Sequence, residues 1–265
     1  GGWAPVTTMA GLMGRCLDAP VQFVHPHRDY SRLRRALSLV PRRRGDQGHL
    51  ILIAARPGDL LAMVGGRPQF GGFESVSAWI FDAFWDEEIP RMARRASFLD
   101  HLFVPDAELV GVYETATHTP VTLLPWGTDT LAGAAGAFGP VRATDVLRLG
   151  RQPSAWDDDA ASAALLAQRG LKFERCPPFS GDAEENQRTV RESLEGSKVV
   201  LASGNAFSAA DYTHPTREYI TARWTDAAAS GTLVAGAPPR CDAVSLLPKS
   251  GLVDIINCPA GPYLN

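Results

Sequence analysis

Residues 218–236 read EYITARWTDAAASGTLVAG, and they combine a helical pattern, a stop and a strand. The helical pattern covers Glu218–Ser230. Gly231 follows at the place where a residue in the left-handed conformation commonly ends a helix. The apolar run Thr232–Ala235 then begins at once, as a strand does after a helix in a layered α/β protein. The segment therefore predicts an α/β fold.

The same alternation of short apolar runs and helical patterns extends along the chain. Before residue 130 the expected strands are Val21–His25, Leu50–Ala54, Val76–Phe81, His101–Val104 and Val121–Leu124, and the expected helices are Thr7–Leu17, Arg28–Val40, Asp59–Val64, Glu87–Ala96 and Ala107–Thr115. After residue 140 the expected strands are Thr144–Leu149, Leu171–Cys176, Val199–Ser203 and Thr232–Ala235, and the expected helices are Asp158–Arg169, Glu184–Glu195 and Glu218–Ser230. Strands separated by helices in this rhythm predict parallel sheets with both faces covered.

The composition changes at residues 131–140, which are mostly glycine and alanine and which we interpret as a linker or hinge. We therefore expect a first domain at residues 1–130 and a second at residues 141–265. The predicted architecture is α/β, with two doubly wound, Rossmann-like domains that face each other across a cleft. Ligands of such sheets bind outside the carboxyl ends of the strands, so the loops after strands are the places to search.

Composition and charge exclude several classes of protein. Hydrophobic residues make up 45% of the 265 residues and charged residues 21%, as in globular proteins rather than disordered ones. The net charge of −3 gives no basic footprint for nucleic acid, and no apolar run is long enough to span a membrane. The four cysteines are scattered without a C-x-x-C spacing, so we expect a reduced, cytoplasmic protein. No cluster of histidines and acids has the spacing of a metal site.

Two acids, Glu218 and Asp226, stand eight positions apart in the first segment. On one continuous helix they would be about 12 Å apart along the axis. That is roughly the span from the ribose to the sugar ring of a nucleotide diphosphate sugar, and a carboxylate can accept two hydrogen bonds from a diol. The pyrophosphate between the two ends would suit the N–H groups at a helix N-terminus.

This segment resembles the retaining GT-B glycosyltransferases, specifically the family 4-like group that includes the CgeB-like proteins. The pattern of that family is Glu-x7-Glu followed by Ala-x-Ala-x-Gly-x-x-Val. The chain matches it at Glu218, Asp226, Ala227, Ala229, Gly231 and Val234, with Asp in place of the second Glu. The resemblance implies that Glu218 contacts the donor sugar and that Asp226, one methylene shorter than the family's residue, holds the ribose diol.

Two further segments support the resemblance. Residues 124–129, LPWGTD, are similar to the Pro-x-Gly-Val-Asp turn that ends the first domain of the family. Gly150 and Arg151 are similar to its Gly-Arg turn, in which the arginine reaches the donor diphosphate and can form bidentate bonds with it. The family often adds a lysine a few residues on, and residues 152–159 contain none.

Other residues are further candidates. Gly1 and Gly2 resemble the glycine-rich loop after the family's first strand, which would make this chain incomplete, although a vector remnant is the alternative. His214, just before the acid pair, is expected near the phosphates. Asp82, after the strand Val76–Phe81, is a candidate catalytic residue that contacts the acceptor or the donor sugar. Seven arginines and one aspartate in Arg28–Arg44 could dock on an anionic membrane or a polyanionic acceptor, but a solvated helix packed on the sheet is the favoured interpretation.

The resemblance implies a glycosyltransferase that moves a sugar from a nucleotide-diphosphate sugar to an acceptor, with retention and without a metal. The nucleotide sugar is a substrate, so no cofactor is expected. The acceptor is a polysaccharide, a lipid-linked molecule or a small molecule, and the enzyme would work in the cytoplasm or at the inner face of the membrane. Two alternatives stay open: a nucleotide-sugar epimerase, and a catalytically degenerate module that only binds the nucleotide sugar.

Overall fold

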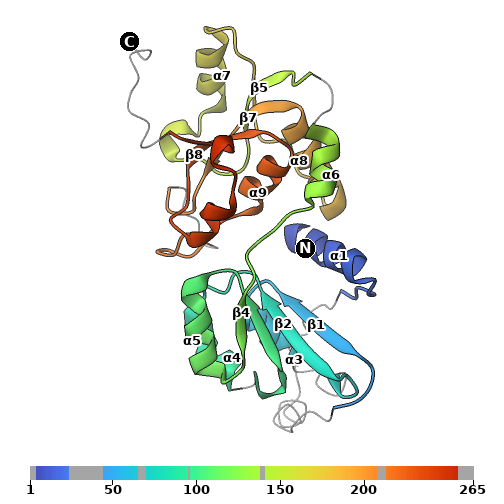
Figure 1. Cartoon of the computed structure of the whole chain (residues 1–265). Coiled ribbons are helices and arrows are strands. Elements are labelled where there is room, and N and C mark those ends of the chain that lie inside the picture. Colours follow the sequence, from blue (N-terminus) through green and yellow to red (C-terminus); the bar gives the residue numbers. More distant parts are fainter. Residues whose placement is uncertain are drawn as a thin grey trace. The chain divides into compact units, whose positions relative to one another are not determined.

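The computed structural model describes residues 4–23, 44–64, 70–94, 96–137, 141–207 and 213–255 (Figure 1). The chain divides into two compact units. One unit is Met13–Pro125, and the other combines Gly1–Leu12 with Trp126–Asn265. Both have an α/β architecture in which parallel strands alternate with helices, consistent with Rossmann-like domains.

The unit Met13–Pro125 has a four-stranded sheet in the order β1-β2-β3-β4, and its strand pairs are parallel. Its strands are β1 (His49–Ala54), β2 (Ser75–Ile80), β3 (His101–Val104) and β4 (Val121–Leu123). Its helices are α3 (Pro57–Val64), α4 (Ile89–Ala93) and α5 (Ala107–Thr117), with 3-10 turns η2 (Asp86–Glu88) and η3 (Ala96–Phe98). Val76, Ala78 and Ile80 share one face of β2 and are fully buried, and Trp79 on the other face is 3% exposed.

The other unit has a five-stranded parallel sheet in the order β6-β5-β7-β8-β9. Its strands are β5 (Thr144–Arg148), β6 (Phe173–Glu174), β7 (Ser197–Ser203), β8 (Leu233–Ala237) and β9 (Leu252–Asp254). Its helices are α6 (Thr130–Ala137), α7 (Asp159–Ala167), α8 (Ala183–Glu195) and α9 (Ala222–Ala229), with 3-10 turns η4 (Ser154–Trp156), η5 (Asp242–Leu246) and η6 (Lys249–Gly251). Helix α1 (Ala4–Leu17) belongs to this unit up to Leu12.

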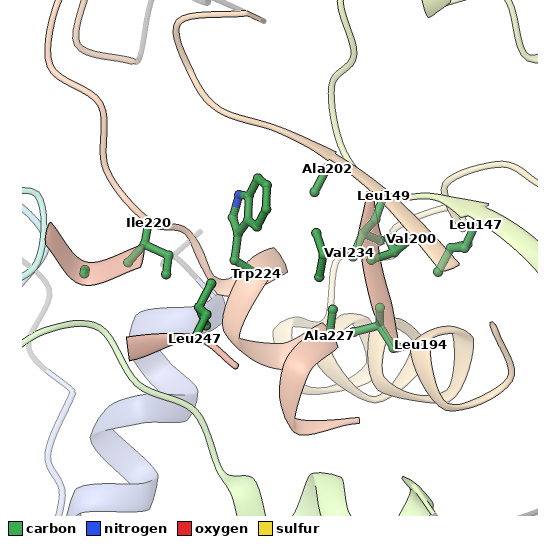
Figure 2. Packing of buried hydrophobic residues seen from close by; sticks show 11 residues of the cluster. Leu147, Leu149, Leu194, Val200, Ala202, Ile220, Trp224, Ala227, Val234 and Leu247 are labelled. Atoms are coloured by element: carbon green, nitrogen blue, oxygen red, sulfur yellow. The ribbon is translucent and has the colours of Figure 1, made fainter. Parts of the chain in front are cut away.

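The core of this second sheet forms around Trp224, which is 1% exposed (Figure 2). Helix α9 packs on β7 and β8, and α8 packs on β7. Figure 2 shows Ala227 of α9 beside Leu194 of α8, with Val200 and Val234 of the sheet close by. The apolar positions of α9 therefore anchor the helix, and its polar positions face elsewhere.

Most expected elements are confirmed within a residue or two, but several expectations are wrong. The helix expected over Glu218–Ser230 begins at Ala222, because the backbone at Thr221 is extended (φ −117°, ψ 163°). Glu218 therefore precedes the helix, and the axial spacing of about 12 Å does not apply. Strand β9 was not predicted. Val21–Phe23 form no strand, and the rest of that expected strand, like the expected helix Arg28–Val40, lies outside the described residues.

Residues 131–137, expected to be part of a linker, form most of helix α6. This helix packs against α8 and α9. A side chain at Gly133 would meet the backbone of Ala229 at 2.9 Å, so the glycine allows α6 and α9 to approach closely. The alanines favour a helix. Gly133, which suggested a hinge, allows close helix packing instead. Residues 138–140 lie outside the described residues.

Among the helices described, none is both long enough and apolar enough to cross a membrane.

Candidate functional site

The order of the five-stranded sheet reverses between β5 and β7, where the strand that follows β5 in sequence lies on its other side. Parallel α/β sheets bind ligands outside the carboxyl ends of the strands at such a reversal. Gly150 and Arg151 follow β5, and Gly204 follows β7. The next residue, Gln152, joins these two ends: its Nε2 donates to the Leu201 carbonyl at 3.2 Å, and its Oε1 accepts from Ser203 Oγ at 3.2 Å. The predicted Gly-Arg turn therefore lies at the position where this fold binds ligands.

Helix α9 contacts the same turn through Arg223. Its Nη1 donates to the Leu149 carbonyl at 3.2 Å and lies 3.5 Å from the Arg151 carbonyl oxygen. Gly150 has φ +73°, and a Cβ at this position would be 2.6 Å from Arg223 Nη1. The positive φ favours glycine, and a Cβ at this position would require the Arg223 guanidinium to move. Arg223 was not predicted as a site residue. Its signal in the sequence is an arginine inside the motif, three residues before Asp226.

Glu218 lies at the carboxyl ends of β7 and β8. Its side chain is 9% exposed and accepts two hydrogen bonds from Arg240, from the backbone N at 3.0 Å and from Nε at 2.9 Å. A Cβ on Gly204 would be 3.7 Å from Glu218 Oε2, so the carboxylate is close to the end of β7. Gly204, in turn, follows Ser203, the partner of Gln152. These contacts bring Glu218 to the same sheet edge as the Gly150–Arg151 turn.

The loop before Glu218 is ordered by two polar side chains. His214 Nδ1 accepts from the backbone N of Thr216 at 3.2 Å and of Arg217 at 3.0 Å. Asn205 Nδ2 donates to the carbonyls of His214 at 3.1 Å and Arg217 at 2.6 Å. His214 thus shapes the turn that presents Glu218, while its expected role near phosphates stays a prediction. Asn205 was not predicted, because nothing in sequence marks a residue that orders a loop ten residues away.

Helix α9 begins next to this edge. Thr221 is its N-cap residue, but its side chain forms no capping hydrogen bond, and the buried Oγ1 has no partner within the described part of the chain. The first N–H groups of a helix and its dipole favour a negative charge. The start of α9 therefore adds to the positive potential at the Gly150–Arg151 turn.

Asp226 lies further along α9 and faces a different environment. Thr128 Oγ1 donates to its Oδ1 at 2.6 Å, and burial raises the pKa of Asp226 to about 6 although Thr128 and Arg191 act to lower it. The carboxylate lines a cavity of about 40 Å³. The other lining residues are Pro5, Thr8, Met9, Leu12, Trp126, Gly127, Thr128, Asp129, Gly133, Gln187, Arg191, Ala222, Ala229 and Ser230. Glu218 does not line this cavity, so the two acids are not brought into one pocket.

Asp82, in the unit Met13–Pro125, follows β2 at the carboxyl edge of the four-stranded sheet. It is 5% exposed, and its carboxylate accepts no hydrogen bond from any residue that the structure describes. Burial raises the pKa of Asp82 to about 7, with a smaller increase from Asp59 and a decrease from Arg56. The Arg56 guanidinium lies 4.5 Å from the ring centroid of Trp85. A buried carboxyl group with a perturbed pKa at a sheet edge is typical of a functional group.

The acids close to Asp82 already have partners. Asp59 Oδ2 accepts from the backbone N of Arg56 at 3.2 Å, and Glu88 Oε2 accepts from the backbone N of Gly58 at 2.6 Å. Glu88 therefore contacts the backbone at the first turn of α3.

Three candidates cannot be placed. Gly1 and Gly2 lie outside the described residues, as do residues 28–43 of the arginine-rich segment. Its last arginine, Arg44, forms an ion pair with Asp100 at 2.8 Å. The membrane role of Arg28–Arg44 therefore stays a prediction.

Comparisons of the chain with protein-family models, with curated proteins and with solved structures gave no match.

Proposed function

We propose that the protein is a glycosyltransferase of the GT-B type, similar to the family 4-like group, which transfers a sugar from a nucleotide-diphosphate sugar to an acceptor. The observation that carries the proposal is the contact of Arg223 with the Gly150 turn. Two segments that resemble the family are about seventy residues apart in sequence, and this contact joins them at one sheet edge. The proposal includes retention at the anomeric carbon, no metal, and two Rossmann-like domains facing each other across a cleft.

The donor diphosphate is proposed to bind between the Gly150–Arg151 turn and the start of α9. A guanidinium gives bidentate, charge-assisted hydrogen bonds to phosphate oxygens, and a helix N-terminus offers unpaired N–H groups. Negative charge builds on the diphosphate as the bond to the sugar breaks. Donors fixed in advance at that position stabilise the transition state more than the bound substrate.

Glu218 is proposed to bind the donor sugar and Asp226 the ribose. Glu218 is close to the proposed diphosphate position through Gly204 and Ser203, which supports its role. Support for Asp226 is weaker in geometry, because it lines a cavity that Glu218 does not share. Thr128, Gln187 and Arg191 line the cavity beside Asp226, and their polar groups can form hydrogen bonds with a hydroxyl group.

Asp82 is proposed to act on the acceptor side. Its carboxylate is buried and accepts no hydrogen bond from the described part of the chain, so a hydroxyl group of a sugar is a suitable hydrogen-bond donor for it. This part of the proposal takes the acceptor to be a polysaccharide, a lipid-linked molecule or a small molecule with a free hydroxyl.

Turnover of nucleotide sugars tests the proposal. The 265-residue chain is incubated with UDP-, GDP-, ADP- and dTDP-hexoses, and chromatography follows both the nucleoside diphosphate and the sugar nucleotide. We expect release of nucleoside diphosphate from at least one donor. Glu218→Gln should slow this release by about 100-fold, as loss of one transition-state contact commonly does, while Glu192→Gln, on the exposed part of α8, should leave it unchanged.

The alternatives give different results in the same assay. Conversion of one sugar nucleotide into another without release of diphosphate indicates an epimerase. Tight binding with no chemical change indicates a degenerate binding module. Either result would contradict the transferase.

A further inference from the structure

The contact between Arg223 and Gly150 supports the proposed function, but that proposal gives the Arg223 side chain no role of its own. The Arg223 guanidinium sits where a side chain of residue 150 would otherwise be, with Nη1 2.6 Å from the position of that missing Cβ. The same nitrogen donates to the Leu149 carbonyl at 3.2 Å and is 3.5 Å from the Arg151 carbonyl oxygen. The guanidinium therefore grips the backbone on both sides of Gly150.

We propose that Arg223 is a positioning residue of the diphosphate site: it holds the Gly150–Arg151 turn against the first turn of α9 and adds positive charge beside Arg151. This inference rests on the proposed function, since it takes the ligand of the turn to be a diphosphate.

The chemistry of the contact favours arginine over lysine. A guanidinium presents several N–H groups in a rigid plane, so it can hold neighbouring carbonyl oxygens in a fixed geometry. An ammonium group is a single charge on a flexible stem and fixes such a geometry less well. Both residues keep the positive charge. Arg223→Lys would therefore keep the positive charge and lose the fixed hydrogen bonds to the carbonyls of Leu149 and Arg151.

Gly150 and Arg223 are expected to depend on each other. The positive φ of Gly150 strains any other residue, and a Cβ there also displaces Arg223. Gly150→Ala should therefore move the guanidinium as well as strain the turn. When Arg223 has already been replaced by Met, the steric part of that penalty is reduced. Residues in contact show such non-additive effects.

Binding of inorganic pyrophosphate tests the inference without knowledge of the nucleotide base. Isothermal titration calorimetry at low salt measures the affinity for the wild type, Arg223→Met, Arg223→Lys and the control Arg188→Met, whose side chain is exposed on α8. Loss of a contact to a charged group weakens binding by about tenfold or more, so we expect this for Arg223→Met. Arg223→Lys should recover part of the affinity, and Arg188→Met should match the wild type.

Two further readouts separate positioning and charge from a purely structural role. The salt dependence of pyrophosphate affinity should become shallower in Arg223→Met and stay near that of the wild type in Arg223→Lys, because only the first removes a charge. In the double-mutant cycle, Gly150→Ala should weaken binding less in the Arg223→Met background than in the wild type. Thermal unfolding checks that each variant is folded. If Arg223→Met does not fold, the comparison of Arg223→Lys with the wild type tests the inference.

The outcomes distinguish this inference from the function on which it rests. If the wild type binds pyrophosphate and Arg223→Met binds it equally well, Arg223 has no role in the site and the inference is overturned. Equal affinity of Arg223→Lys and the wild type for pyrophosphate would likewise contradict the role of the guanidinium hydrogen bonds. If the wild type itself does not bind pyrophosphate, the proposed diphosphate site is overturned together with the inference.

Discussion

Asp82 and Asp226 are two carboxylic acids whose surroundings raise their pKa, to about 7 and about 6 respectively. In both the main cause is burial, which disfavours the charged form. They differ in their partners: Thr128 donates to Asp226, whereas no described residue donates to Asp82. The raised pKa of each acid can be tested by removing the charge of Asp82 or the hydrogen-bond partner of Asp226.

Asp82→Asn should be more stable than the wild type at high pH, and the difference in the free energy of unfolding should grow as the pH rises. The folded-state pKa of Asp82 is raised from 3.8 to about 7, so the folded protein binds the proton more tightly than the unfolded chain. Its contribution to stability is then full below pH 3.8 and is lost as the pH rises through 7. Asn carries no charge and avoids this loss. Relative to the wild type, the free energy of unfolding of Asp82→Asn should increase between pH 5 and pH 8, by roughly 1–4 kcal/mol.

Urea unfolding followed by circular dichroism at pH 5, 6.5 and 8 measures this effect. The control is Asp46→Asn, because Asp46 is exposed in the same unit. A stability difference between Asp82→Asn and the wild type that does not change with pH would show that Asp82 is ionised normally in the folded protein.

Thr128→Val should destabilise the protein more at pH 8 than at pH 5. The substitution keeps the shape of the side chain and removes the hydroxyl that donates to Asp226 at 2.6 Å. At pH 8 the carboxylate is charged and loses a hydrogen bond, at a cost of about 1–3 kcal/mol. At pH 5 most of Asp226 is protonated, so the lost bond matters less. Unfolding in urea at the two pH values measures the difference, with Thr115→Val on the exposed face of α5 as the control.

A pH-independent loss, or no loss in Thr128→Val, would mean that the hydroxyl does not stabilise the ionised form of Asp226.

At the scale of elements, helix α9 combines three tasks in eight residues. Trp224 and Ala227 are buried in the core, Arg223 contacts the Gly150 turn, and Asp226 lines the cavity. Because the faces of a helix repeat every 3.6 residues, neighbouring positions point in different directions. The packing of Trp224 therefore fixes the directions in which Arg223 and Asp226 project.

The other end of α9 is joined to its neighbours by Arg142. Its guanidinium donates to Leu194 O at 3.2 Å, Ser230 O at 2.6 Å and Thr232 Oγ1 at 2.7 Å, and also to Ser197 O. These partners belong to the ends of α8 and α9 and the starts of β7 and β8. Arg142→Met would remove all four of these hydrogen bonds, including the one to the Ser230 carbonyl, although Thr232 Oγ1 would still donate to the carbonyls of Leu194 and Ser197. We expect a loss of about 2–4 kcal/mol in the free energy of unfolding.

The midpoint of urea unfolding checks this prediction, with Arg188→Met as the matched control. A midpoint for Arg142→Met equal to that of the control would contradict the role of Arg142 in joining these elements.

The elements that were predicted well are those whose sequence pattern lies within the element itself. The strand Val76–Phe81 is a continuous apolar run, and β2 occupies Ser75–Ile80. The start of α9 was predicted wrongly because residues 218–221 have a helix-compatible composition, whereas the backbone is extended at Thr221 and Glu218 binds Arg240, which is distant in sequence. Residues 131–137 were predicted wrongly because a glycine that permits close helix packing, as Gly133 does, cannot be told from a hinge glycine by composition.

At the scale of the whole molecule, the α/β class and the position of the Gly150–Arg151 turn after a strand could be predicted from the sequence. The order of strands could not, because β6 pairs with β5 on the far side from β7 and no local pattern encodes which side a strand takes. The contact between Arg223 and Gly150 and the cavity beside Asp226 depend on residues far apart in the chain. Such contacts need three-dimensional information.

The central claim for the whole molecule is that the unit containing residues 126–265 binds a nucleoside diphosphate at the Gly150–Arg151 turn. A ligand that binds only the folded state raises its stability by mass action. The most direct measurement is a thermal-shift titration of the 265-residue chain with UDP, GDP, ADP and dTDP, beside Arg151→Ala, Glu218→Ala and the control Arg188→Met. The claim predicts that at least one nucleoside diphosphate raises the melting temperature in the wild type and the control, and raises it less in Arg151→Ala and Glu218→Ala. No rise with any of the four, or an equal rise in all variants, would contradict it.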